Sequence, residues 1–460
     1  MYCPPLAFLG PHGESVLLPF LVQVTVIILA ARLFASLFQK LGQPAAVGEM
    51  AAGLVLGPSV LGQFMPDLWP KLFDAGTHQV FGVLSELGLI LLVFLVGLEF
   101  DFTRLRKQRR AAVCISAVGI LLPFALGWGL ARWIHARLES FVDPFGFALF
   151  MGTAMSITAL PMLGRMMVEL NITRTRLGAI AITAAAVGDA SGWIMLAAVS
   201  AAVAAQFQSS ATLWMIAETI GFALAMRFIA RPMLRGWIRQ ALRQGDGDLQ
   251  LNSLAILLGV IFLCAIATNL IGICAVFGAF MLGSVLSDEH EFRAAVACRL
   301  RDFVNVFFLP IFFTYTGLRT DIAALGTPEL WACAAGVFLV AVLGKFGGCT
   351  LAAWASGLSL RESACIGAMM NTRGLMELFV VNVGYELGVI PRSVFCMLVL
   401  MALLTTVMTT VMLRVFMRGT ELERFIAESG LGASRWQSRA WQSSADGVGI
   451  ARIVQRAIAF

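Results

Sequence analysis

The amino-acid sequence predicts an all-α polytopic membrane protein with about 13 transmembrane helices. Of its 460 residues, 59% are hydrophobic and only 13% are charged. A soluble globular chain carries roughly 25% charged residues. The apolar residues also gather in long runs separated by short polar loops. This pattern is typical of a chain that is solvated mainly by lipid.

The membrane spans can be read in order from the apolar runs, because a spanning helix needs roughly 20 apolar residues. The candidates are residues 16–38, 44–62, 80–100, 111–131, 144–165, 177–203, 211–230, 251–269, 271–287, 303–318, 331–356, 362–388 and 393–417. The second, ninth and tenth of these segments are short and rich in glycine. An odd number of spans places the two termini on opposite sides of the membrane.

Basic residues concentrate in alternate loops, which predicts the orientation. They follow spans 3, 5, 7 and 9: Arg104, Arg106, Lys107, Arg109, Arg110, Arg174, Arg176, Arg231, Arg235, Arg239, Arg243, Arg293, Arg299 and Arg301. The positive-inside rule then puts residues 1–15 outside as an N-terminal tail and residues 418–460 in the cytoplasm as a C-terminal tail. These arginines and lysines are therefore topology signals, and no nucleic-acid partner is expected.

An internal repeat relates the two halves of the chain. Gly97-Leu98-Glu99-Phe100-Asp101 resembles Gly317-Leu318-Arg319-Thr320-Asp321 at an offset of 220 residues, and two further glycine-containing patterns recur at offsets of 221 and 225. The offset corresponds to seven spans, and an odd shift reverses direction through the membrane. We therefore expect two inverted six-helix repeats, 16–203 and 251–417, joined by a linker helix at 211–230.

Two isolated ionisable residues lie inside apolar spans. Asp189 lies within the run 177–203, and Lys345 lies within the run 337–354. An ionised side chain at bilayer depth costs roughly 2.5 to 3.5 kcal/mol on insertion scales, and such residues commonly mark a route for ions or protons. Asp189 has no basic residue near it in its own span. Desolvation disfavours the charged form of such a carboxyl, so it can exchange a proton.

The other ionisable residues within spans are open to two interpretations. Glu49, Glu86 and the pair Arg373 and Glu377 could be secondary carboxylates and charge-stabilising groups of the same route. They could equally be buried partners that fix helix packing. Arg373 and Glu377 are four residues apart, which places them on one face of a helix.

Two segments at corresponding positions of the repeats predict broken, crossing helices in spans 5 and 12. Span 5 contains Ser156-Ile157-Thr158-Ala159-Leu160-Pro161, and span 12 contains Asn371-Thr372-Arg373-Gly374. Unwound backbone at the midplane frees carbonyl groups that can ligate a cation. Ser156, Thr158 and Asn371 are therefore predicted to line an ion site. A simple proline or glycine kink is the alternative for either segment alone, but corresponding interruptions in both repeats favour an ion site.

Other classes of site have no support in the sequence. The nine cysteines are scattered, without a CxxC pair or a Cys/His cluster, so neither a disulfide framework nor a zinc site is expected. No cofactor is expected. The amino terminus lacks the basic region of a cleavable signal peptide.

Several motifs resemble the monovalent cation:proton antiporter-2 family. Its second-span signature is similar to Gln43-Pro44 with Val47-Gly48-Glu49-Met50, Gly53 and Leu56 to Gly62, and its third span to Phe94 through Glu99. The segments around Ser156 to Pro161 and Met370 to Leu378 resemble plant cation/proton exchangers and bacterial glutathione-gated potassium efflux systems. The resemblance covers roughly residues 16 to 417.

The resemblance implies a secondary antiporter that exchanges Na⁺ or K⁺ for protons by alternating access. Asp189 aligns with the carboxylate that binds cation and proton in competition, and Lys345 aligns with the basic residue near the crossing helices. A homodimer is implied, with a dimer or gate domain and a moving core domain in each subunit. The inner membrane of a cell is the expected location.

Three departures from the family pattern bear on the exchange. Gly188 stands where the family usually has Asp, Asn or Gln, and Asn269 stands where relatives often have an acidic residue. A single titratable carboxylate predicts one-for-one, electroneutral exchange, and the space beside Gly188 slightly favours K⁺ over Na⁺. The cytosolic nucleotide-binding module of the potassium efflux systems is not among the 43 residues after position 417, so regulation through it is not expected.

The sequence has three alternative interpretations besides antiport. An intramembrane aspartyl protease needs two facing carboxylates that share a proton, but Gly188-Asp189 has no second unpaired membrane aspartate as partner. A channel would use the polar residues as a pore lining, whereas inverted repeats favour alternating access. A sodium- or proton-coupled solute symporter of related architecture is the more serious alternative. Cation flux driven by a proton gradient, without added solute, separates it from an antiporter.

The C-terminal tail combines aromatic and basic residues, including Arg435, Trp436, Arg439 and Trp441. Such a segment can lie on the anionic cytoplasmic leaflet, with its aromatic rings at headgroup depth. A disordered end is the alternative.

Overall fold

The computed structural model describes residues 17–73, 75–99, 109–138, 142–172, 175–204, 209–244 and 249–423. These residues form helices and no strand, so the all-α prediction is confirmed. Nine helices of this part are long and apolar enough to cross a membrane, or ten if one bent pair counts as a single span. The expected total of about thirteen spans is therefore not confirmed.

Three expected spans, 211–230, 271–287 and 303–318, account for the difference. α13 (Ala275–Leu286) has 12 residues, which is about 18 Å of helix against a hydrocarbon core of about 30 Å. α10 (Ser209–Ala225) and α15 (Leu309–Arg319) are each interrupted by a π-helical turn at one end. These segments are apolar, as the sequence predicts, but the positions of their helix ends are set by turns and packing.

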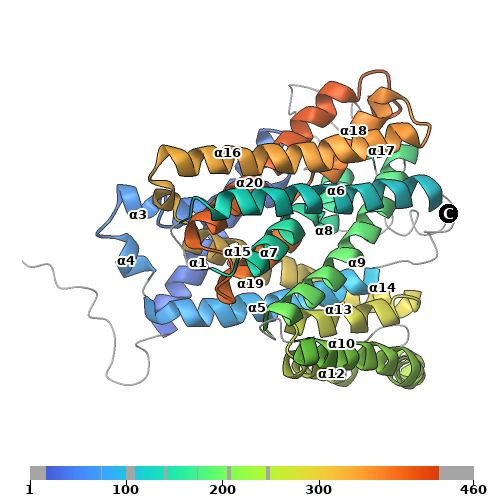
Figure 1. Ribbon diagram of the computed structural model, residues 1–460. Coiled ribbons are helices and arrows are strands. Elements are labelled where there is room, and N and C mark those ends of the chain that lie inside the picture. The colour runs from blue at the N-terminus through green and yellow to red at the C-terminus, as the bar shows by residue number, and fades with distance from the viewer. Residues whose placement is uncertain are drawn as a thin grey trace, which may run out of the picture.

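One group of helices, which we call the outer bundle, forms one side of the molecule. Its members pack on one another: α1 (Leu17–Lys40), α2 (Ala45–Leu56), α5 (Ala75–Glu99), α12 (Leu251–Ile271), α13, α14 (His290–Phe303) and α15. Two short helices, α3 (Leu61–Phe64) and α4 (Trp69–Leu72), connect α2 to α5. In Figure 1, α10 and α12 lie together at the bottom of the molecule, and α5 and α13 lie above them.

The remaining helices form a second group, which we call the crossing bundle. Its members are α6 (Arg109–His135), α7 (Pro144–Ser156), α8 (Leu160–Glu169), α9 (Arg176–Ala204), α16 (Pro328–Val342), α17 (Gly348–Ala355), α18 (Leu360–Met370), α19 (Leu375–Glu386) and α20 (Arg392–Phe416). A π-helical turn, Leu343–Gly347, joins α16 to α17. In Figure 1, α6 and α16 run side by side at the top. α10, a π-turn at Met226–Ala230 and α11 (Arg231–Gln244) link the two bundles.

Glycine contacts hold the outer bundle together. α2 crosses α15 where a Cβ atom on Gly317 would lie 2.1 Å from the carbonyl carbon of Gly53. α5 crosses α13 where a Cβ atom on Gly283 would lie 2.2 Å from the carbonyl oxygen of Phe94, beside Gly97. No larger residue fits at these distances. The glycines of the repeated sequence patterns therefore allow two backbones to meet.

The chain folds back after its last long helix. Leu422 is fully buried beside residues of α9 and α18. The Glu421 Oε1 atom accepts a hydrogen bond of 2.6 Å from the Leu177 backbone N–H at the start of α9. A carboxylate at a helix N-terminus satisfies a free N–H and complements the helix dipole. The predicted membrane-surface segment around Arg435 and Trp441 lies outside the described residues.

Candidate functional site

The first helix break lies between α7 and α8. α7 ends at Ser156, residues 157–159 are extended, and α8 starts at Leu160. Ile157 has φ −75° and ψ 143°, which is far from helical geometry. Pro161 explains the break, because its ring disfavours helical backbone at the preceding residue and would clash with a carbonyl one turn earlier. The predicted interruption of span 5 is present.

The second break lies between α18 and α19. α18 ends at Met370 and α19 starts at Leu375, and the two helices are bent by 44° relative to each other. A Cβ atom on Gly374 would lie 2.7 Å from Met162 Cγ of α8. A glycine therefore lets the second break approach the helix that follows the first one.

The two breaks cross each other. The Ala159 backbone N–H donates to the Thr372 carbonyl oxygen over 3.4 Å, which ties the first break to the second. Each half-helix that ends here leaves carbonyl groups without a partner in its own helix. These carbonyls carry the negative end of the helix dipole into the centre of the crossing bundle.

Lys345 caps the carbonyl end of α7. It is fully buried, and it lies on the π-helical turn between α16 and α17. Its Nζ atom donates to the Ser156 carbonyl oxygen and to Thr158 Oγ1, both at 2.5 Å. Two of the predicted site residues are thus engaged by a cation that belongs to the protein itself.

Arg373 caps the same helix end from the second break. Its guanidinium donates to the carbonyl oxygens of Ala154 at 3.0 Å and Met155 at 2.8 Å. It also forms a fully buried ion pair of 2.9 Å with Glu377. Three consecutive carbonyls of α7 are therefore neutralised by two cations, one of which has its own carboxylate partner. Arg373 and Glu377 pair as expected, but Arg373 lies in the break two residues before α19 begins and not on one helix face with Glu377.

Asp189 lies in the middle of α9 with 1% of its surface exposed. Its Oδ1 atom makes no hydrogen bond to any described residue. A Cβ atom on the neighbouring Gly188 would lie 3.8 Å from both Thr158 Oγ1 and Ser116 Oγ. α9 therefore places Asp189 next to the broken segment of α7 and α8. The structure brings Asp189, Thr158 and Lys345 into one region.

Two further buried polar side chains belong to this region. Both amide atoms of the fully buried Asn371, in the second break, have no hydrogen-bond partner among the described residues. The same is true of Ser116 Oγ on α6, which sequence reasoning missed. Buried polar atoms in native proteins nearly always have partners, so these groups are candidates for ligands of an ion or a water molecule.

Glu49 and Glu86 belong to the outer bundle. Glu49 on α2 is buried and lies 3.8 Å from the Arg32 guanidinium of α1. Glu86 on α5 is exposed. Neither residue is part of the helix crossing, so the structure does not group them with Asp189.

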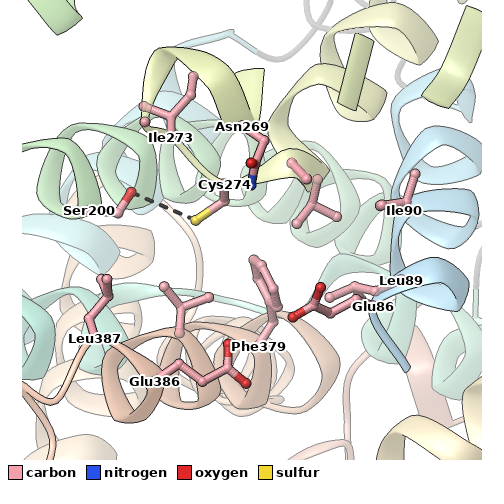
Figure 2. Close-up of a pocket in the computed structure, with 14 residues that line it drawn as sticks. Glu86, Leu89, Ile90, Ser200, Asn269, Ile273, Cys274, Phe379, Glu386 and Leu387 are labelled. Atoms are coloured by element: carbon pink, nitrogen blue, oxygen red, sulfur yellow. Dashed lines mark hydrogen bonds between the residues drawn. The ribbon is translucent and has the colours of Figure 1, made fainter. Parts of the chain in front are cut away.

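Glu86 lines a cavity of about 350 Å³ between the two bundles. In Figure 2, Glu86 and Glu386 lie on one side of this cavity, and Asn269 and Cys274 lie opposite. Phe379 of α19 and Ser200 of α9 complete the wall from the crossing bundle. Asp189 is not among the lining residues. Glu86 and Glu386 are 300 residues apart, and no pattern in the sequence relates them.

Comparisons with known proteins decide the family. The model of the sodium/hydrogen exchanger transmembrane family matches residues 25–419. The chain belongs to the sodium/hydrogen exchanger family. The resemblance read from the second, third, fifth and twelfth spans is thereby confirmed. The chain is a membrane transporter of the cation/proton exchange class, and a multi-pass integral membrane protein.

Individual relatives agree with this membership. The chain is 39% identical over 400 residues to the Na⁺/H⁺ antiporter NhaS4 of Synechocystis. This match covers 85% of this chain and 95% of the relative. It is 35% identical to cation/H⁺ antiporter 18 of Arabidopsis thaliana and 30% identical to K⁺/H⁺ antiporter 1 of Saccharomyces cerevisiae. Both matches cover 86% of this chain, but only 49% and 46% of those longer relatives.

A solved structure shares the fold of this sodium/hydrogen exchanger. The sodium proton antiporter MjNhaP1 of Methanocaldococcus jannaschii superposes with a TM-score of 0.63 at 17% sequence identity. The match covers 91% of this chain and all of that one. Two chains with so few identical residues therefore share one helical architecture.

Proposed function

We propose that this chain exchanges a monovalent cation, Na⁺ or K⁺, for protons, and that both bind in turn at Asp189. One observation carries the proposal: Asp189 is buried, one of its oxygens lacks a hydrogen-bond partner among the described residues, and it lies beside the helix crossing. A carboxylate in such a place needs a proton or a cation to compensate its charge.

Lys345 and Arg373 stabilise the crossing in this proposal. Together they neutralise the carbonyl end of α7, so the broken helix is stable while Asp189 changes its occupant. The Thr158 hydroxyl oxygen accepts a hydrogen bond from Lys345. The Thr158 hydroxyl proton can still be donated toward Asp189. Asn371 completes the site through its amide group, and Ser156 contributes by holding Lys345 through its carbonyl oxygen.

The charge inventory favours electroneutral exchange. The pair Arg373 and Glu377 sums to zero, and a protonated Lys345 stays in place throughout. A proton and a monovalent cation each add one positive charge to the same carboxylate. The loaded site therefore has the same charge in both directions of transport, which makes the exchange one-for-one. Gly188 leaves space beside the ion for water or for the larger K⁺.

Alternating access would come from movement of the crossing bundle against the outer bundle. The inverted repeat is supported by helix pairing, because an offset of about 220 residues interchanges the pair α2 and α15 with the pair α13 and α5. The loop charges support an outside amino terminus in an inner membrane. In this orientation the cavity at Glu86 opens outward. The resemblance favours a homodimer.

The proposal is tested in proteoliposomes that contain a pH-sensitive dye. Asp189→Asn keeps the shape of the side chain and removes its charge, so cation-driven recovery of dye fluorescence should be abolished. Asp321→Asn is the matched control: this carboxylate caps a short surface helix, Ile322–Leu325, and exchange should persist. Wild-type exchange by Asp189→Asn would contradict the assignment.

A further inference from the structure

The cavity between the bundles ends before it reaches Asp189. Its wall on the crossing-bundle side includes Ser200 of α9 and Phe379 of α19. Asp189 lies on the same helix as Ser200, eleven residues earlier, which is about 16 Å along the axis. Three helical turns thus separate the Asp189 carboxylate from Ser200, and eleven residues bring the two side chains back to nearly the same face.

Trp193 occupies the space between them. It follows Asp189 by four residues and therefore lies on the same face of α9. Only 3% of its surface is exposed. Its indole N–H comes close to the Asp189 carboxylate, although neither Trp193 Nε1 nor Asp189 Oδ1 completes a hydrogen bond within the part of the chain that the structure describes.

The Trp193 ring is clamped by two phenylalanines. It stacks on Phe280 of α13, with ring centroids 5.7 Å apart and planes 25° apart. It also contacts Phe379, with centroids 5.8 Å apart and planes tilted by 41°. Phe379 forms part of the cavity wall, so the cluster stands directly behind that wall.

The three rings come from both bundles. Phe280 belongs to the outer bundle, whereas Trp193 and Phe379 belong to the crossing bundle. Stacked aromatic rings exclude water, and a relative movement of the bundles would separate Phe280 from the other two. The cluster is therefore a seal whose state depends on how the bundles are placed.

We infer that Trp193 is a gate residue of the exchange: with Phe280 and Phe379 it closes the path between the cavity and Asp189. The inference rests on the proposed function for the role of Asp189. That the three rings close the path to position 189 does not depend on that role. A purely structural aromatic cluster would hold the bundles together without controlling access to position 189.

Access is measured by chemical labelling in the full-length chain with its nine cysteines replaced. Asp189→Cys then provides one thiol, and its reaction with a small charged methanethiosulfonate is followed in detergent. Trp193→Ala should raise the labelling rate at least tenfold. Trp193→Phe keeps an aromatic ring in the stack and should leave the rate within about twofold of the parent. Phe280→Ala, which removes the outer-bundle ring, should also raise the rate.

The matched control is Phe147→Ala. Phe147 is fully buried in α7 of the same bundle but belongs to neither the ring cluster nor the cavity wall. An increase with Phe147→Ala equal to that with Trp193→Ala would indicate general loosening and overturn the inference. An unchanged rate in both Trp193→Ala and Phe280→Ala would also overturn it.

The two proposals can fail separately. Labelling requires no transport, so the gate can be established even if Asp189→Asn retains exchange and the assignment of Asp189 is wrong. If Asp189→Asn abolishes exchange while the gate variants leave labelling unchanged, the carboxylate assignment stands and the gate does not. Should Trp193→Ala fail to yield folded protein, Phe280→Ala and Trp193→Leu provide the same comparison.

Discussion

Replacing Lys345 by alanine removes the cation that caps the carbonyl end of α7. The Ser156 carbonyl and the Thr158 hydroxyl oxygen both lose a donor at 2.5 Å. Both acceptors are buried, so water cannot easily replace the ammonium group. We expect lower thermal stability and lower exchange activity together.

The size of the effect follows from these two hydrogen bonds. A buried acceptor left without a donor costs about 1–3 kcal/mol, which gives about 2–6 kcal/mol for two. Relief of the desolvation of the ammonium group offsets part of this loss. A net decrease of about 2–4 kcal/mol in the free energy of unfolding corresponds to a Tm decrease of roughly 5 °C, because the Tm change per kcal/mol becomes smaller in longer chains.

Thermal unfolding of the purified protein in detergent measures the change. Lys345→Met keeps the apolar stem and should resemble Lys345→Ala, whereas Lys345→Arg keeps the charge and should be milder. Lys40→Ala is the control, because Lys40 is exposed at the end of α1. A Lys345→Ala protein with wild-type Tm and wild-type exchange would refute the reasoning.

Four further predictions concern transport. Thr158→Val should weaken apparent cation affinity while exchange still requires Asp189; unchanged affinity would remove Thr158 from the site. Lowering the pH should raise the apparent KM for the cation, by up to tenfold per pH unit, because protons compete for Asp189; a pH-independent KM would exclude competition. Wild-type exchange at zero ΔpH should not respond to an imposed membrane potential. Gly188→Asp adds a second carboxylate where a Cβ atom would meet nothing closer than 3.8 Å, and its exchange should respond by up to about 2.3 kcal/mol per charge per 100 mV. Deletion of 431–460 should leave exchange intact and shift its pH dependence, and complete loss in a folded protein would show that the tail is part of the machinery.

Much of the fold and part of the candidate site could be predicted from local sequence. Pro161 and Gly374 act on their own backbone, so both helix breaks were visible in the chain before any packing was known. Arg373 and Glu377 are only four residues apart, so their ion pair joins near neighbours in the chain, although Arg373 lies in the break just before α19. Asp189 and Lys345 could be predicted as functional residues because an ionised side chain within the bilayer costs free energy.

Other features depend on packing between distant segments. The carbonyl end of α7 is capped by Lys345 and Arg373, which are about 190 and 220 residues away in the chain. No local sequence pattern predicts which carbonyl oxygens accept their hydrogen bonds. The cavity joins Glu86 to Glu386, and the ring cluster joins Trp193 to Phe280 across the two bundles. The count of about thirteen full-length spans was not confirmed, because helix ends at π-turns are set by tertiary contacts. The sequence by itself determined composition, breaks and charges, which are local properties. Only the tertiary structure decided which of these groups share a site, because that depends on how helices far apart in the chain pack together.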